Sequence, residues 1–192
     1  MAVSPDDVRR GLPAWAVVGD GRVAHIARVM TMLEGWAAAR GVPARERQRW
    51  LRAALLHDSL READEAVLQR YPPLPAWPMK TWHGPAAATA AAADGERDQG
   101  VLDAVRYHSF GYAPWDDAGR MLYLADYLEP GRPYEREKLD AFAARVPAEP
   151  AAVLRDVASM RLAWRIRNGG RIARETWEFW NSIAADASSS RG

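Results

Sequence analysis

The stretch RERQRWLRAALLHD, residues 45–58, joins a predicted buried helix directly to a histidine and an aspartate. Near its end the stretch is apolar on most sides of a helix, through Trp50, Leu51, Ala54 and Leu55. A helix that is apolar nearly all round is typical of a central, buried element. We therefore expect His57 and Asp58 to lie where a buried helix ends, just before the polar turn at Ser59.

Helical periodicity recurs on both sides of this stretch, and no run of residues is a convincing strand. Further helices are predicted at 20–40, 62–69, 83–93, 98–108, 117–128 and 135–144, then a long one capped at 168–170 and a last one around 177–180. The chain has no internal repeat and no linker long enough to separate two domains. We predict a single all-α globule of eight or nine helices over residues 1–192, with a disordered tail at 188–192.

Composition limits the classes of protein to consider. With 192 residues, 48% apolar and 27% charged, the chain has the size and balance of one soluble domain. A net charge of +1 without a lysine or arginine block argues against a nucleic-acid-coating protein. The absence of cysteine excludes disulfides and thiolate metal sites, so any metal must be held by His, Asp or Glu.

Two features of the sequence predict a cytoplasmic location. Acidic residues, Asp6 and Asp7, stand where a signal peptide would carry basic residues. The longest low-polarity stretch, from Pro85 to Ala93, is too short to cross a bilayer. We therefore expect a cytoplasmic protein with neither a membrane nor a nucleic acid as its partner.

Each of the four histidines in the chain lies at the edge of a predicted helix: His25, His57, His83 and His108. A lone histidine on an apolar face is more often a core residue than a ligand. Here, however, no histidine lies outside the set, and Asp58 and Asp126 accompany it. Imidazole nitrogens and carboxylate oxygens that converge from separate helices are what a divalent metal site requires. Two His and two Asp would leave open positions on a six-coordinate ion for water and a phosphate oxygen.

The order of these residues resembles the HD-domain metal phosphohydrolase superfamily. Finer motifs are similar to one branch, the YqeK-like symmetrical bis(5'-nucleosyl)-tetraphosphatases, which are diadenosine tetraphosphate hydrolases. The motifs are ALLHD at 54–58, WHGP at 82–85, VRYHS at 105–109 and ADYLEPGR at 125–132. The last of these is the most specific, and the resemblance spans roughly residues 21–180.

The resemblance implies symmetrical hydrolysis of diadenosine tetraphosphate to two ADP by a metal-activated water. It favours iron as the cofactor, as one or two ions, with manganese or zinc as alternatives. The metal ligands it implies are His25, His57, Asp58 and Asp126. It implies catalytic roles for Asp58, His83 and His108, with both histidines close to a second ion. The substrate contacts it implies are His25, His83, His108, Ser109, Arg132, Gly170, Arg171 and Arg174.

One segment departs from the family pattern. The family usually has a small residue and then a lysine shortly after the His-Asp pair, where this chain has Ser59-Leu60-Arg61. Arginine keeps the charge of lysine but presents a planar fork instead of a compact ammonium. The departure therefore bears on the substrate and the rate, and it leaves the metal residues intact.

Two other functions stay open on the sequence alone. The same site could serve another HD-type nucleotide phosphatase or phosphodiesterase with a different substrate. Alternatively, the chain could be a non-catalytic sensor that binds ADP without hydrolysis. The expected partner in each case is a small nucleotide, and nine tryptophans together with the resemblance favour a homodimer.

Overall fold

Helix α7 (Asp117–Leu128) lies at the centre of the fold. In the computed structural model, which describes residues 2–131 and 135–189, α7 packs against helices on both sides: α2 (Asp20–Ala39), α3 (Ala44–Leu56), α6 (Gln99–Tyr107), α8 (Arg136–Arg145) and α9 (Pro150–Arg167). Most of its side chains are buried, as expected of a helix with neighbours all round. Its N-terminus is capped by the Asp116 carboxylate, which accepts a hydrogen bond from the N–H of Ala118.

The remaining elements of the described residues are α1 (Pro5–Gly11), α4 (Glu65–Leu68), a 3-10 helix (Met79–Thr81), α5 (His83–Ala93) and α10 (Arg174–Ser189). Residues 2–131 and 135–189 thus hold ten α-helices, nine of them with at least seven residues, and no strand. The prediction of one all-α globule is confirmed. None of the helices in these ranges is long and apolar enough to span a membrane.

Three local features differ from the sequence-based expectation. Helix α1 was not predicted; Ser4 and Asp7 form a reciprocal capping box that starts it. Helix α4 covers only 65–68 of the expected 62–69, because residues 59–62 form turns after α3. The expected disordered tail overlaps the end of α10, which includes residues 188 and 189, and residues 190–192 lie outside the described part of the chain.

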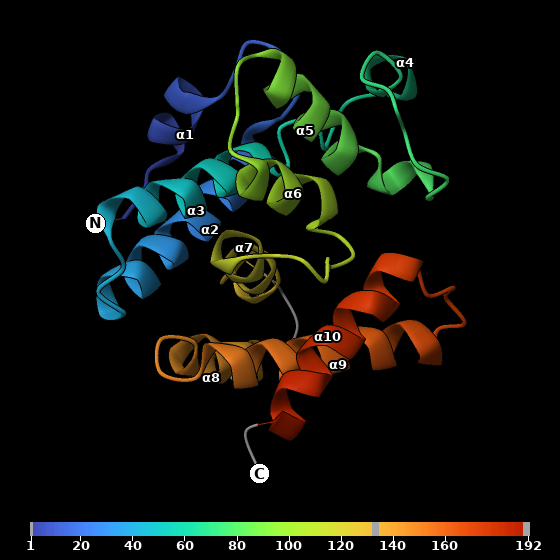
Figure 1. The fold of residues 1–192 in the computed structure, drawn as a ribbon. Coiled ribbons are helices and arrows are strands. Elements are labelled where there is room, and N and C mark those ends of the chain that lie inside the picture. The colour runs from blue at the N-terminus through green and yellow to red at the C-terminus, as the bar shows by residue number, and fades with distance from the viewer. Residues whose placement is uncertain (1, 132–134, 190–192) are drawn as a thin grey trace.

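The last three helices form a layer beneath α7 in the view of Figure 1, where α10 crosses α9. The two helices pack on each other, and a short turn with Gly169 at φ +65 joins them. A left-handed conformation of this kind is accommodated by glycine without steric cost. Because α9 also packs on α7, this layer covers the side of the central helix that α2, α3 and α6 leave open.

Helices α5 and α6 approach closely because α5 consists almost entirely of small residues. A Cβ atom at Gly84 would lie 3.0 Å from the carbonyl oxygens of Val105 and Arg106 and 3.2 Å from Cε1 of His108. The start of α5 can therefore rest on the end of α6 only where a side chain is absent. This contact places His83, the first residue of α5, beside His108, the residue after α6.

We expect Gly84→Ala to lower the free energy of unfolding by about 1–3 kcal/mol, because its methyl group would press on backbone atoms that cannot easily yield. Gly35→Ala in α2 is the control, since a Cβ there meets nothing within 4 Å. Removing glycine from that helix interior should stabilise the protein by roughly 0.5–1 kcal/mol. Urea unfolding measures both changes, and the same effect at both positions would disprove a tight α5–α6 contact.

Candidate metal centre

The structure brings four histidines and two aspartates together in the interior. His25 comes from α2, His57 and Asp58 from the end of α3, His83 from the start of α5, His108 from the end of α6 and Asp126 from α7. Five of these residues are buried, and the Asp126 side chain is 14% exposed. Five helices therefore position the six side chains, although the sequence separates them widely.

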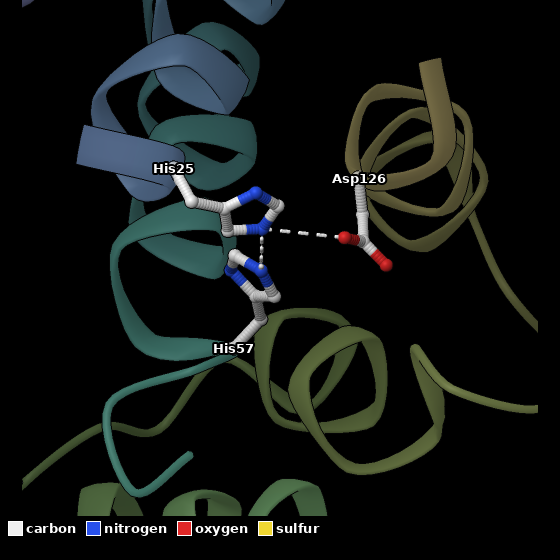
Figure 2. A group of neighbouring side chains, drawn as sticks. All are labelled: His25, His57 and Asp126. Atoms are coloured by element: carbon white, nitrogen blue, oxygen red, sulfur yellow. Dashed lines mark hydrogen bonds and ion pairs between the residues drawn. The ribbon is translucent and has the colours of Figure 1, made fainter. Parts of the chain in front are cut away.

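A first cluster consists of His25, His57 and Asp126. The Nε2 atoms of the two histidines lie 3.3 Å apart, and Nε2 of His25 lies 3.3 Å from Oδ1 of Asp126. Figure 2 shows both rings and the carboxylate directed toward one point from three separate helices. One ligand atom from each residue can thus reach a single ion.

A second cluster consists of Asp58, His83 and His108. Oδ1 of Asp58 lies 3.2 Å from Nε2 of His83 and 3.6 Å from Nε2 of His108. The two imidazoles also face each other, with 3.1 Å between their Nε2 atoms. One ligand atom from each of these three residues could reach a single ion.

The Asp58 carboxylate lies between the two clusters. Its Oδ1 faces the second cluster, while its Oδ2 lies 3.7 Å from Nε2 of His25 and 3.6 Å from Nε2 of His57. Two oxygens on one carbon can serve two ions at once, as in two-metal hydrolytic sites. The His-Asp pair at the end of α3 therefore supplies a ligand to the first cluster and a bridge to the second.

Three of the histidines are oriented by the helices that carry them. The Nδ1 atoms of His57, His83 and His108 lie 2.6, 3.2 and 2.8 Å from the carbonyl oxygens of the residues three positions earlier. A ring nitrogen that donates to a carbonyl carries the proton, which leaves the lone pair on Nε2. Lone pairs that face each other repel without a cation between them, so this donor set fits divalent metal ions.

Glu129 supports the first cluster and was given no role by the sequence. This buried carboxylate lies 3.3 Å from Nδ1 of His25, and it accepts hydrogen bonds from Nε of Arg28 and from the N–H of Gly131. Burial raises the pKa of Glu129, but the hydrogen bonds from His25 and Arg28 outweigh it and lower that pKa to about 2. The anion can then orient His25 as the partner carboxylates of metal-bound histidines do.

Arg22 is a second unpredicted contact. It lies one turn before His25 on α2, and its Nη1 donates to Oδ2 of Asp58 over 2.6 Å. Burial raises the pKa of Asp58, but the neighbouring histidines outweigh it and lower that pKa well below the usual value. Asp58 is therefore an anion that Arg22 and the imidazoles hold in place.

The surroundings shift the histidine pKa values in opposite directions. Burial lowers the pKa of His25, but its contacts with Asp126 and Glu129 outweigh the burial and raise that pKa to about 9. Burial lowers the pKa of His108 to about 3, and repulsion from His83 adds to the effect. In the metal-free protein His25 is therefore protonated at neutral pH, and a metal ion has to displace that proton.

A cavity of about 580 Å³ adjoins the metal residues. Asp126 and Ser109 lie in its wall on the metal side, and Oγ of Ser109 is 3.2 Å from Nε2 of His108. Its apolar wall includes Phe110, Tyr127, Trp164, Ile172 and Trp180. The volume lies in the range of small-molecule sites, so the cavity is large enough to hold a nucleotide beside the clusters.

The other expected substrate contacts are not gathered at this cavity. Gly170, Arg171 and Arg174 are not among its described lining residues. The Arg174 side chain is 81% exposed and paired with Glu178. Arg132 lies outside the described residues. Of the predicted phosphate contacts that the structure describes, leaving the histidines aside, only Ser109 lies in the cavity wall.

The unusual segment after the His-Asp pair has two residues in the core and one that reaches a backbone group beside the second cluster. Ser59 and Leu60 are fully buried, and Leu60 belongs to the main hydrophobic core. The exposed Arg61 approaches the carbonyl oxygen of Lys80 at 3.4 Å. Leu60 therefore serves packing here, whereas Arg61 shares the Lys80 carbonyl oxygen with Nδ1 of His83.

Comparison with known proteins adds three findings. A family model described as HD domain matches residues 22–131. Over 54 residues the chain is 37% identical to the symmetrical bis(5'-nucleosyl)-tetraphosphatase of Bacillus subtilis (strain 168). The aligned stretch covers 28% of this chain and 29% of that protein. The chain thus matches less than a third of the length of this curated relative.

A solved structure has the same fold. It is the crystal structure of a predicted HD superfamily hydrolase involved in NAD metabolism from Clostridium acetobutylicum, with a TM-score of 0.77 and 21% identity. The match covers 95% of this chain and 98% of that one. At this identity the likeness establishes the arrangement of the helices and nothing about the substrate.

The affinity of the metal-free protein for Mn²⁺ should rise with pH below the His25 pKa of about 9, by up to about tenfold per unit, because the ion displaces one proton. Calorimetry in buffers of different ionisation enthalpy counts that proton. Glu129→Gln removes a contact that raises the His25 pKa. The Mn²⁺ affinity of this variant should therefore depend less steeply on pH near neutrality. Identical pH profiles for the two proteins would contradict the assignment.

Replacing the shared carboxylate should empty both clusters. We expect Asp58→Asn to lower the metal content from two ions to well below one per chain, since both groups of ligands use or adjoin this residue. His108→Ala should remove only the ion of the second cluster. Asp103→Asn, on α6 and outside both clusters, is the matched control. Plasma mass spectrometry measures the metal content, and full loading of Asp58→Asn would refute the bridge.

Proposed function

The chain belongs to the HD domain family, and we propose that it is a metal-dependent phosphohydrolase that cleaves diadenosine tetraphosphate symmetrically to two ADP. The observation that carries the proposal is the pair of His/Asp clusters sharing Asp58 beside a cavity of nucleotide size. The similarity to a symmetrical tetraphosphatase over 54 residues supports the choice of substrate.

We assign one ion to His25, His57, Asp126 and Asp58, and a second ion to Asp58, His83 and His108. A bound divalent ion would lower the pKa of a water from 15.7 to about 7 and polarise a phosphoryl oxygen. The protein's own part is placement: Glu129 and Arg22 fix His25 and Asp58, and three backbone carbonyls fix the other rings. Fixed ligands require little reorganisation during the reaction.

His83 and His108 are better suited to metal binding than to proton transfer. Each uses Nδ1 toward a backbone carbonyl and directs Nε2 toward the Asp58 carboxylate. The pKa of about 3 at His108 keeps that ring neutral near pH 7, so its Nε2 has no proton to donate. We therefore assign them to the second ion rather than to protonation of the leaving phosphate.

The identity of the metal follows from the ligands only in part. Neutral imidazoles and carboxylates suit iron, manganese and zinc alike. We propose iron, on the resemblance to the tetraphosphatase branch, with manganese or zinc able to replace it. Cytoplasmic location and a homodimer stay predictions.

Two alternatives share the metal centre. Another HD-type nucleotide phosphatase or phosphodiesterase would keep the clusters and change the nucleotide. A nucleotide sensor would bind ADP and hydrolyse nothing. The buried, complete set of six ligands favours an enzyme over a sensor, because a binding module has no need of two adjacent metal positions.

The products formed from diadenosine tetraphosphate test the proposal. After reconstitution with Fe²⁺ or Mn²⁺, chromatography should show ADP alone. Asp58→Asn should reduce the rate at least about 10³-fold, because loss of metal activation removes several kcal/mol of transition-state stabilisation. Asp103→Asn should retain the wild-type rate.

Other outcomes contradict the proposal in distinguishable ways. AMP together with ATP would show asymmetric cleavage. Turnover only of another nucleotide would support the phosphatase alternative. Tight ADP binding without hydrolysis, with both ions present, would support the sensor.

A further inference from the structure

Arg161 of α9 is held in the wall of the cavity beside the metal residues. Its guanidinium carbon lies 4.2 Å from the ring centroid of Tyr123 and 5.4 Å from that of Tyr127. Its Nη2 donates to the carbonyl oxygen of Ser109 over 3.1 Å. Two cation–π contacts and a hydrogen bond fix the long side chain before any ligand arrives.

One nitrogen of this guanidinium makes no hydrogen bond of normal geometry with the described residues. Nη1 of Arg161 is buried and has no hydrogen-bond partner among the described residues. An arginine in a protein is always protonated, and a buried charged N–H that lacks an acceptor destabilises the protein. Four other arginines also have a buried nitrogen without a partner among the described residues: Arg22, Arg47, Arg120 and Arg136. Arg161 differs from them because it lies in the wall of the cavity beside the metal residues, where a ligand could supply the acceptor.

The position of Arg161 defines the kind of acceptor. Ser109, to which Arg161 is tethered, contacts His108 of the second cluster through its Oγ. Trp164 and Trp180 lie in the apolar wall of the same cavity. An anionic group bound by Arg161 would therefore lie in a cavity that has metal residues in one part of its wall and aromatic rings in another. Phosphate oxygens are acceptors that the arginine fork binds well.

We propose that Arg161 binds a phosphate of the nucleotide in the cavity whose wall holds both the aromatic rings and metal residues. The ligand class is a nucleoside phosphate with an aromatic base. The assignment rests on the proposed function for the reaction, but it concerns binding and does not require turnover. The sequence assigned no role to Arg161, and the expected contacts of Arg171 and Arg174 stay predictions.

Calorimetric titration of the Mn²⁺-loaded protein with ADP and, separately, with adenosine tests this role. Arg161→Met should weaken ADP binding at least about tenfold, because a charge-assisted hydrogen bond is lost, and should change adenosine binding by less than about threefold. Arg161→Lys keeps the charge without the planar guanidinium. Its affinity for ADP should therefore lie between those of the wild type and Arg161→Met. Arg167→Met, at the exposed end of the same helix, removes the same charge outside the cavity and should bind ADP like the wild type.

The other outcomes of the titration distinguish phosphate binding by Arg161 from a structural role and from the proposed function. If Arg161→Met weakens ADP binding and adenosine binding equally, Arg161 has a structural role. Unchanged ADP affinity in this variant, or no ADP binding by the wild type, would overturn the proposal. If Arg161→Met unfolds by circular dichroism, Arg161→Lys carries the same comparison. ADP binding that depends on Arg161, without cleavage of diadenosine tetraphosphate, would refute the proposed function and leave this inference standing.

Discussion

The whole centre depends on one electrostatic constraint, the burial of several imidazole lone pairs around a single carboxylate. Nε2 atoms face each other at 3.1 and 3.3 Å, and the Asp58 oxygens lie within 3.7 Å of all four histidines. Uncompensated groups of this kind are costly to bury. Divalent cations would relieve the repulsion between the facing nitrogens of His83 and His108 and would take the place of the proton on His25, so the fold and the metal ions should stabilise each other.

Helix ends and small residues bring the buried ligands of this centre together. His57 and His108 follow the last residues of α3 and α6, and His83 opens α5, so three ligands use helix termini that the backbone itself orients. Gly84 allows two of those termini to touch. Asp126 projects from the central helix, which also packs on α9. The same helix thus connects the metal residues to the layer that contributes Arg161 to the cavity.

Local signals made part of this arrangement predictable. Periodicity and composition predicted an all-α globule. The four histidines and two aspartates marked the centre because each of them lies in or directly after a recognisable helix. Contacts that cross the fold left no such signal. Arg28 and Glu129 are 101 positions apart, and Arg161 reaches Ser109 across 52 positions. An arginine that lines a cavity is indistinguishable in sequence from a solvated one, so Arg161 received no role from the sequence.

The most direct test of a shared carboxylate between two ions is anomalous scattering from crystals of the protein loaded with Fe²⁺ or Mn²⁺. Data at the metal edge should show two peaks, one among His25, His57 and Asp126 and one between His83 and His108, with an Asp58 oxygen ligating each. A single peak, or an Asp58 carboxylate turned away from the ions and bound only to Arg22, would contradict the account.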